Sequence, residues 1–243
     1  MKVFLLLTLS LCLSGQVIGQ AKRIHLPNYR LADSTNYWQQ WAKSNECKVG
    51  LEPLEKSPHP FHFRISSTGG EIIEIWQQSE TFQGTFTEWV KDADNDLRPF
   101  ERFYFQHYAL DTSQAVAISE LIKNSAILQL PSDESIKGWQ QGFDGVEIVI
   151  QYSDNKNYYL KNYWTPSSQN GLAEAQLVQQ FQSKLLELAN ATIVRKSFRD
   201  NIPFPSFIND NGVATIRAVS YEDYWKHKRD VYRYVRSMKR EKE

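Results

Sequence analysis

Apolar and polar positions alternate along the middle of the chain with the period of two that is typical of β-strands. The first such stretch runs from Phe61 to Ile65 and is followed by a turn signal at Gly69-Gly70. Three further candidate strands follow, one beginning at Ile72, one at 82–90 and one at 102–110. Because short consecutive strands joined by turns pair with their neighbours, this pattern predicts an antiparallel meander.

Residues 145–164 carry the clearest hairpin pattern in the chain. The apolar side chains of Val146, Ile148 and Ile150 alternate with their neighbours, and a polar loop at 153–157 follows. The chain then returns through an aromatic segment at 158–164. Two alternating runs on either side of a short polar loop predict two paired antiparallel strands.

The period changes to that of a helix in three places. A capping box, in which Asp111 is followed three residues later by Gln114, predicts that one helix begins there. Apolar residues at helical spacing predict a second helix over 171–189, and Ser220 caps a third. Residues 36–42 are a candidate for a further short helix, and 214–219 for a short strand.

These blocks of strands and helices predict an α+β fold, in which an antiparallel sheet of meander plus hairpin is packed by about three helices. The domain itself is expected over 61–219. An extension at 20–60, interrupted by prolines, is expected to pack on it, and 220–243 is expected to form a basic amphipathic helix.

The first nineteen residues have the layout of an export signal. Lys2 is followed by the apolar run Val3–Leu13, and short residues at Val17–Gly19 precede Gln20. The run is too short to span a bilayer, so a cleavable signal peptide and a secreted or periplasmic protein are expected. A bulky leucine before Cys12 argues against a lipid anchor.

Composition narrows the classes of function. The 28 basic and 28 acidic residues balance, so no overall charge would attract nucleic acid. After loss of the signal only Cys47 remains, which excludes an intramolecular disulfide. Pro60 prevents His59 and His62 from sharing a helical turn, so no metal site is predicted, and no cofactor motif occurs.

Two motifs occur in order around the predicted hairpin. Trp139–Gly145 has the pattern W-x-x-G-x-D-G, and Tyr163–Pro166 has the pattern Y-W-x-P. Together with Glu174, which precedes a helix, they resemble a family of uncharacterised exported bacterial proteins, with a likeness that covers about residues 70–200. The resemblance implies one exported domain and implies no activity.

The same motifs supply the first candidate binding site. Trp139, Tyr163 and Trp164 are candidates for an aromatic platform that stacks on a sugar or peptide, with Gln140 and Gln141 donating amide hydrogen bonds. The alternative is structural, because Asp144-Gly145 is a turn signal and the rings would then pack on the sheet.

The predicted C-terminal helix supplies the second candidate site. Its basic residues Lys228, Arg229, Arg233 and Arg236 are candidates for docking to an acidic partner or to an anionic membrane surface. The alternative is a solvated helix face whose cations favour the helix C-terminus.

Three classes of function follow. The leading hypothesis is a non-catalytic binding or interaction module for a glycan, a peptide or an envelope protein. The second is a secreted hydrolase with an acidic pair, for which the sequence offers four candidates: Glu71, Glu74, Glu80 and Glu88. The third is a structural subunit that docks through the basic helix.

Overall fold

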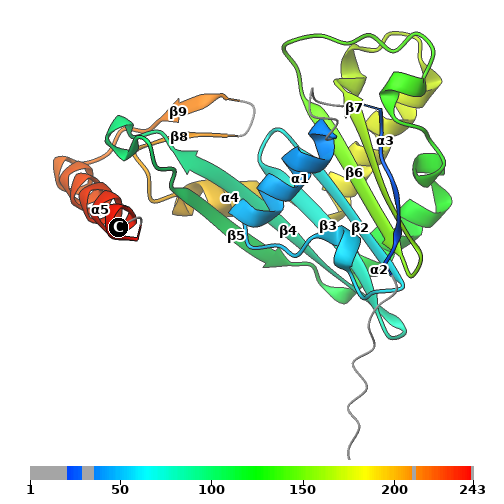
Figure 1. Cartoon of the computed structure of the whole chain (residues 1–243), viewed down its shortest axis with the longest axis horizontal. Helices are drawn as coiled ribbons and strands as arrows, with labels where there is room; N and C mark the ends of the chain where they lie inside the picture. The colour runs from blue at the N-terminus through cyan, green and yellow to red at the C-terminus, as the bar shows by residue number, and fades with distance from the viewer. Residues whose placement is uncertain (1–20, 29–35, 210–211, 242–243) are drawn as a thin grey trace, which may run out of the picture.

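The computed structural model describes residues 21–28, 36–209 and 212–241, so the predicted signal peptide lies outside the described residues. These residues form a curled, mostly antiparallel sheet with helices on both faces (Figure 1). The α+β class is therefore confirmed. Within the described residues the sheet has nine strands and is accompanied by five α-helices, where the sequence pattern predicted about three.

The predicted meander is present. It consists of β2 (Phe61–Ser67), β3 (Glu71–Gln78), β4 (Thr81–Asp92) and β5 (Phe103–Ala109), each antiparallel to the one before it. The turn between β2 and β3 requires glycine, because Gly70 has φ +92° and a Cβ there would lie 2.6 Å from the Trp89 carbonyl oxygen.

The predicted hairpin is also present, as β6 (Glu147–Asp154) and β7 (Asn157–Trp164). It extends the meander, because β6 pairs antiparallel with β2, with Ile65 opposite Ile150. The extension contributes β1 (Arg23–His25), which pairs parallel with β7, and α1 (Tyr37–Lys48). The helix α1 begins where Asn36 accepts a hydrogen bond from the Gln39 backbone N–H.

The helices divide between the two faces of the sheet. On one face α2 (Thr112–Asn124), α3 (Ala173–Leu188) and α4 (Ala191–Asn201) cover the main apolar core, and α1 covers the opposite face (Figure 1). Because side chains alternate along a strand, Ile148 and Ile150 contribute to the first core and Val149 to the second.

A buried charge cluster lies between α1 and the sheet. Arg64 of β2 is only 1% exposed, and its guanidinium lies 2.6 Å from a carboxylate oxygen of Glu46 on α1 and 2.6 Å from one of Glu74 on β3. Gln151 of β6 donates to the same Glu46 oxygen at 2.8 Å. The cluster thus connects α1 to three strands.

The C-terminal part extends the far end of β4. There β8 (Ser206–Ile208) pairs with Lys91 and Asp92, β9 (Ala214–Ile216) pairs with β8, and α5 (Tyr221–Arg240) begins at the predicted cap Ser220. Figure 1 shows α5 at the end of the molecule away from β7. In the described ranges no helix combines the length and apolar character needed to cross a bilayer.

Candidate functional site

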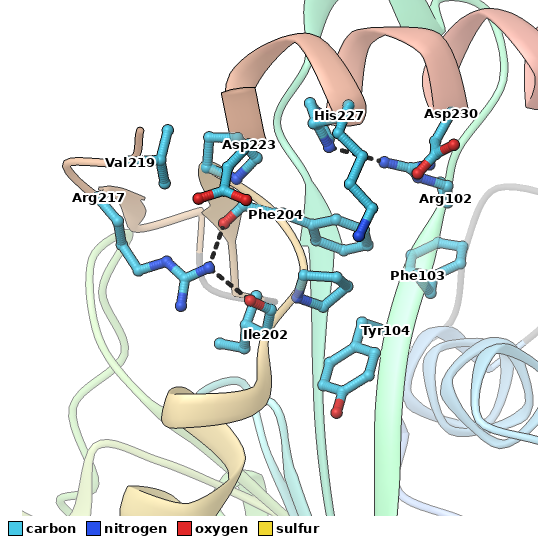
Figure 2. Close-up of a pocket in the computed structure, with 13 residues that line it drawn as sticks. Arg102, Phe103, Tyr104, Ile202, Phe204, Arg217, Val219, Asp223, His227 and Asp230 are labelled. Atoms are coloured by element: carbon cyan, nitrogen blue, oxygen red, sulfur yellow. Dashed lines mark hydrogen bonds between the residues drawn. The ribbon is translucent and has the colours of Figure 1, made fainter. Parts of the chain in front are cut away.

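A cavity of about 570 Å³ lies between α5, the start of β5 and the segment that joins α4 to β8 (Figure 2). Its volume is in the range of ligand-binding pockets. The lining combines aromatic rings, prolines and charges of both signs: Arg102, Phe103, Tyr104, Ile202, Pro203, Phe204, Pro205, Arg217, Val219, Asp223, Lys226, His227 and Asp230.

The segment Ile202–Pro205 shapes one wall of the cavity. The helix α4 ends at Asn201, since Pro203 lacks a backbone N–H and disfavours a helical conformation at the residue before it. The chain therefore continues in an extended form and buries Phe204, whose ring lies 4.8 Å from the Arg102 guanidinium. Tyr104 stacks on Phe198 at 5.3 Å, which holds its ring against the same wall.

His227 attaches α5 to the sheet above this wall (Figure 2). Its Nδ1 lies 3.1 Å from Nη2 of Arg102. Because a guanidinium only donates, Nδ1 is the acceptor and the imidazole proton is on Nε2. That nitrogen lies 3.3 Å from Asp94, and Arg102 donates through Nε to Asp92 at 3.0 Å.

Arg217, directly after β9, holds the opposite wall together. Its Nη2 donates to the carbonyl oxygens of Ile202 and Phe204, the latter at 2.9 Å (Figure 2). Its Nη1 donates to the carbonyl oxygen of Arg199 at 3.2 Å. Within the described residues its buried Nε has no hydrogen-bond partner. These bonds explain why the α4–β8 segment and β9 stay together around the cavity.

The aromatic residues predicted as a platform lie elsewhere, at the end of β7. Tyr163 is fully buried in the main core, and Trp139 and Trp164 are half-buried. Trp139 packs 5.8 Å from the Tyr163 ring, and its indole N–H donates to the Trp164 carbonyl at 2.9 Å. The three residues are together, but they contact one another and the sheet, as in the structural interpretation.

The side chains of Gln140 and Gln141 are exposed, and the backbone of Gln140 is hydrogen-bonded to the side-chain amide of Gln169. The Gln140 backbone N–H donates to the Gln169 side chain at 2.8 Å, and the Gln169 amide nitrogen donates to the Gln140 carbonyl at 3.0 Å. The side chains of Gln140 and Gln141 therefore point from a loop that Gln169, which the sequence analysis did not single out, holds in place.

Replacement of Gly145 by alanine is expected to lower the free energy of unfolding by about 1–3 kcal/mol. A Cβ there would lie 2.0 Å from the Thr165 hydroxyl and 2.9 Å from the Trp164 indole nitrogen, so the loop must move off Trp164. Urea denaturation measures the change. Alanine at the exposed neighbour Asp144 is the control, with an expected change within about 0.5 kcal/mol. Equal effects would mean that close packing on Trp164 is not the cause.

The basic residues predicted on the last helix are in different environments. Lys228 is engaged within the chain, with its ammonium 2.9 Å from an oxygen of Asp94 and 2.7 Å from one of Asp96. Arg229, Arg233 and Arg236 are exposed. Lys228 therefore holds α5 on the β4–β5 loop, and the three arginines remain available on its outer face.

The candidate acidic residues of the sheet are mostly paired with cations. Glu71 and Glu88 lie opposite each other on β3 and β4 beside Arg195 of α4, and burial together with Glu71 raises the pKa of Glu88 to about 8. Glu74 belongs to the Arg64 cluster. In the described part of the chain no group of three or more His, Cys, Asp or Glu side chains is placed to hold a metal ion.

A second acid pair was missed by the sequence analysis. Asp133, in the short helix Asp133–Ser135, and Glu147 of β6 both bind the Asn162 amide nitrogen, at 3.2 and 2.8 Å. They are 1% and 5% exposed, so solvent scarcely reaches them. Asp133 also accepts the Trp164 backbone N–H at 2.7 Å, which satisfies part of the β7 edge.

Comparison of the chain with protein-family models, with curated proteins and with solved structures found no match. Fold and cavity define the class as an α+β protein whose C-terminal helix covers one end of a curled sheet. The family resemblance of the two motifs stays a prediction.

Proposed function

We propose that this protein is a non-catalytic binding module that holds a peptide segment between α5 and the end of the sheet. The observation that carries the proposal is the 570 Å³ cavity, whose lining offers aromatic rings beside cations and carboxylates. A peptide presents apolar side chains, charges of both signs and backbone amides, and so matches such a mixed lining better than a purely apolar ligand does.

The neighbouring strand supports a peptide as the ligand. In the described part of the chain β9 is the last strand of the sheet, and all three of its residues are exposed, with Ile216 at 84%. An unpaired strand edge can bind an extended peptide through backbone hydrogen bonds. Arg217 and Val219 follow β9 directly and line the cavity, so a peptide paired with β9 would place side chains there.

The geometry of His227 favours binding over catalysis at this site. A general base needs an accessible nitrogen within reach of a substrate proton. His227 is 6% exposed, with Nδ1 facing Arg102 and Nε2 facing Asp94. Its role is therefore to fix α5 over the cavity.

A second candidate function is docking of the whole protein through the outer face of α5. It is favoured by exposed Tyr221 and Tyr232, at 79% and 68%, beside the exposed arginines of the same helix. Export to the periplasm or the exterior would place this face near acidic envelope partners, and that location remains part of the proposal.

Peptide and glycan arrays probed with the protein test the leading proposal, followed by affinity measurements on the best peptide. Val219→Trp is expected to weaken peptide binding at least about tenfold, equivalent to about 1.4 kcal/mol, because the indole would occupy the cavity. Val219 is 39% exposed, so the substitution spares the core. Ile193→Trp on α4 is the control, because Ile193 is 69% exposed and belongs to neither the lining nor β9, so this variant should bind normally.

Three outcomes would contradict the proposal. Equal affinity of Val219→Trp and the unmodified chain would exclude the cavity as the site. Binding to glycans with no binding to peptides would favour the predicted platform at Trp139 and Trp164. Binding lost only on replacement of Arg229, Arg233 and Arg236 by glutamate would favour docking through α5.

A further inference from the structure

A second cavity, of about 220 Å³, lies on the face of the sheet covered by α2 and α3, beside the β6–β7 hairpin. It is lined by six residues: Leu128, Ile150, Tyr152, Asp154, Tyr159 and Lys161. It shares no lining residue with the cavity beneath α5, so a ligand here would not depend on the proposed peptide site. An engineered cavity of about 150 Å³ accommodates benzene, which sets the scale of a ligand that would fit.

Lys161 is the feature of this cavity that points to a ligand. It lies opposite Ile150 on the inward register of the hairpin and is half-buried, and its ammonium donates to the Leu128 carbonyl at 2.6 Å. Burial lowers the pKa of Lys161 to about 8. None of the carboxylates in the described ranges forms an ion pair with it.

The carboxylate that lines the same cavity is bound elsewhere. Asp154 Oδ1 accepts the backbone N–H groups of Lys156 and Asn157 at 2.6 and 2.7 Å, and the Asn157 amide binds both oxygens. These bonds hold the hairpin turn and, despite partial burial, lower the pKa of Asp154. The ammonium of Lys161 thus lacks the counter-ion that a partly desolvated charge gains most from.

The rest of the lining includes two aromatic rings that stack on each other. The rings of Tyr152 and Tyr159, opposite each other on β6 and β7, stack at 6.0 Å with an angle of 18° between their planes. His25 of β1 stacks on Tyr159 at 4.3 Å and 10°. Because these contacts cover the faces of Tyr159, a ligand in the cavity would meet ring edges. Ring edges favour the face of a planar aromatic ligand, since an edge-to-face contact adds to the gain from area burial.

We propose that this cavity binds a small aromatic carboxylate, with its ring against Tyr152 and Tyr159 and its carboxylate on the Lys161 ammonium. A charge-assisted hydrogen bond to a half-buried cation is stronger than a neutral one, and it completes the pairing that the chain leaves open.

Benzoate is the probe, titrated into the full chain by calorimetry at pH 7. Lys161→Met is expected to lower benzoate affinity at least about tenfold. Lys156→Met is the matched control, because it removes the same charge from an exposed position of the same hairpin and should bind benzoate normally. Benzyl alcohol, which keeps the ring without the charge, should bind the unmodified chain at least about tenfold more weakly.

The pH dependence supplies a readout that a structural role of Lys161 would not change. The Lys161 ammonium donates to the Leu128 carbonyl, and the titratable groups that share its cavity are Asp154, Tyr152 and Tyr159. Lys22 interacts with the charge of Asp154, and His25 stacks on Tyr159. Benzoate requires the protonated lysine, so its affinity should fall as the pH rises through about 8. At pH 8 binding should take up protons, which appears as a dependence of the measured heat on buffer ionisation enthalpy.

Equal losses in Lys161→Met and Lys156→Met would overturn the proposal, because a general charge effect would then explain binding. Equal affinity for benzyl alcohol and benzoate would overturn it as well, since the cavity would then be an apolar pocket. A benzoate affinity that is the same at pH 7 and pH 9 would also overturn the proposal, because binding would then not depend on the protonated lysine.

Discussion

Replacement of Arg64 by methionine is expected to lower the free energy of unfolding by about 3–5 kcal/mol. The guanidinium is 1% exposed and lies between the carboxylates of Glu46 and Glu74, and it also donates to the Glu52 carbonyl at 3.2 Å. Although burial alone would raise it, the neighbouring His62, whose Nε2 lies 3.6 Å from the carboxylate, and the charge and hydrogen bonds of Arg64 lower the pKa of Glu74 to about 2. Removing the cation leaves two buried acids with neutral hydrogen-bond donors alone, Gln151 for Glu46 and Thr85 for Glu74.

Urea denaturation followed by circular dichroism measures this loss, with Arg229→Met on the exposed face of α5 as the control. Where Arg64→Met alone does not fold, adding Glu46→Gln and Glu74→Gln should restore much of the stability, because neutral amides do not need the cation. Arg64→Met with the stability of the control would contradict the prediction, and so would a triple variant less stable than Arg64→Met.

The free energy of unfolding is expected to fall on the order of 3 kcal/mol between pH 5 and pH 8.5. Burial, followed by the charge of Asp133, raises the pKa of Glu147 from 4.5 to about 8. A carboxylic acid whose pKa is raised in the folded protein keeps its proton there over this pH range, whereas the same group in the unfolded chain has lost it. The stabilisation from Glu147 is fully present below pH 4.5 and is lost as the pH rises through about 8. The raised pKa of Glu88 makes stability fall with pH in the same direction.

Glu147→Gln should flatten this profile, because glutamine resembles the protonated acid and still accepts the Asn162 hydrogen bond. We expect it to match the unmodified chain at pH 5 and to exceed its stability at pH 8.5. Glu120→Gln, on the exposed side of α2, should leave the profile unchanged. A profile equally steep in Glu147→Gln would show that this carboxyl group ionises normally in the folded protein.

Each candidate site has at least one feature that can be recognised in the sequence. The glycines of the W-x-x-G-x-D-G motif let the loop approach Trp164, because a Cβ at Gly142 or Gly145 would lie 2.4 or 2.9 Å from its indole. Asp144-Gly145 was recognisable as a turn signal. The cavity beneath α5 is different. His227 and Val231, one helical turn apart, are the buried residues of α5, and His227 also lines the cavity. A histidine at helical spacing from Val231 in the predicted last helix is a signal that the sequence analysis did not use.

Other features had only a faint local signal. Lys161 stands between Tyr159 and Tyr163 on the inward register of the hairpin, so a cation on the core face was visible in the pattern. The absence of an ion pair was not visible, because the ammonium binds the Leu128 carbonyl from a distant segment while the Asp154 carboxylate binds the hairpin turn. The helix α4 was not predicted, because it has no side-chain cap at its start. The residue before it, Asn190, has a left-handed conformation with φ 53°.

The sequence by itself determined the strands β2 to β7 and the helices α2, α3 and α5, because period, turn residues and caps act between residues close in the chain. Only the tertiary structure decided that β6 pairs with β2, that Arg64 meets Glu46, and that α5 closes a cavity over Phe204. These contacts join segments far apart in the chain. Their partners are selected by packing, burial and charge compensation over the whole fold, which no local pattern contains.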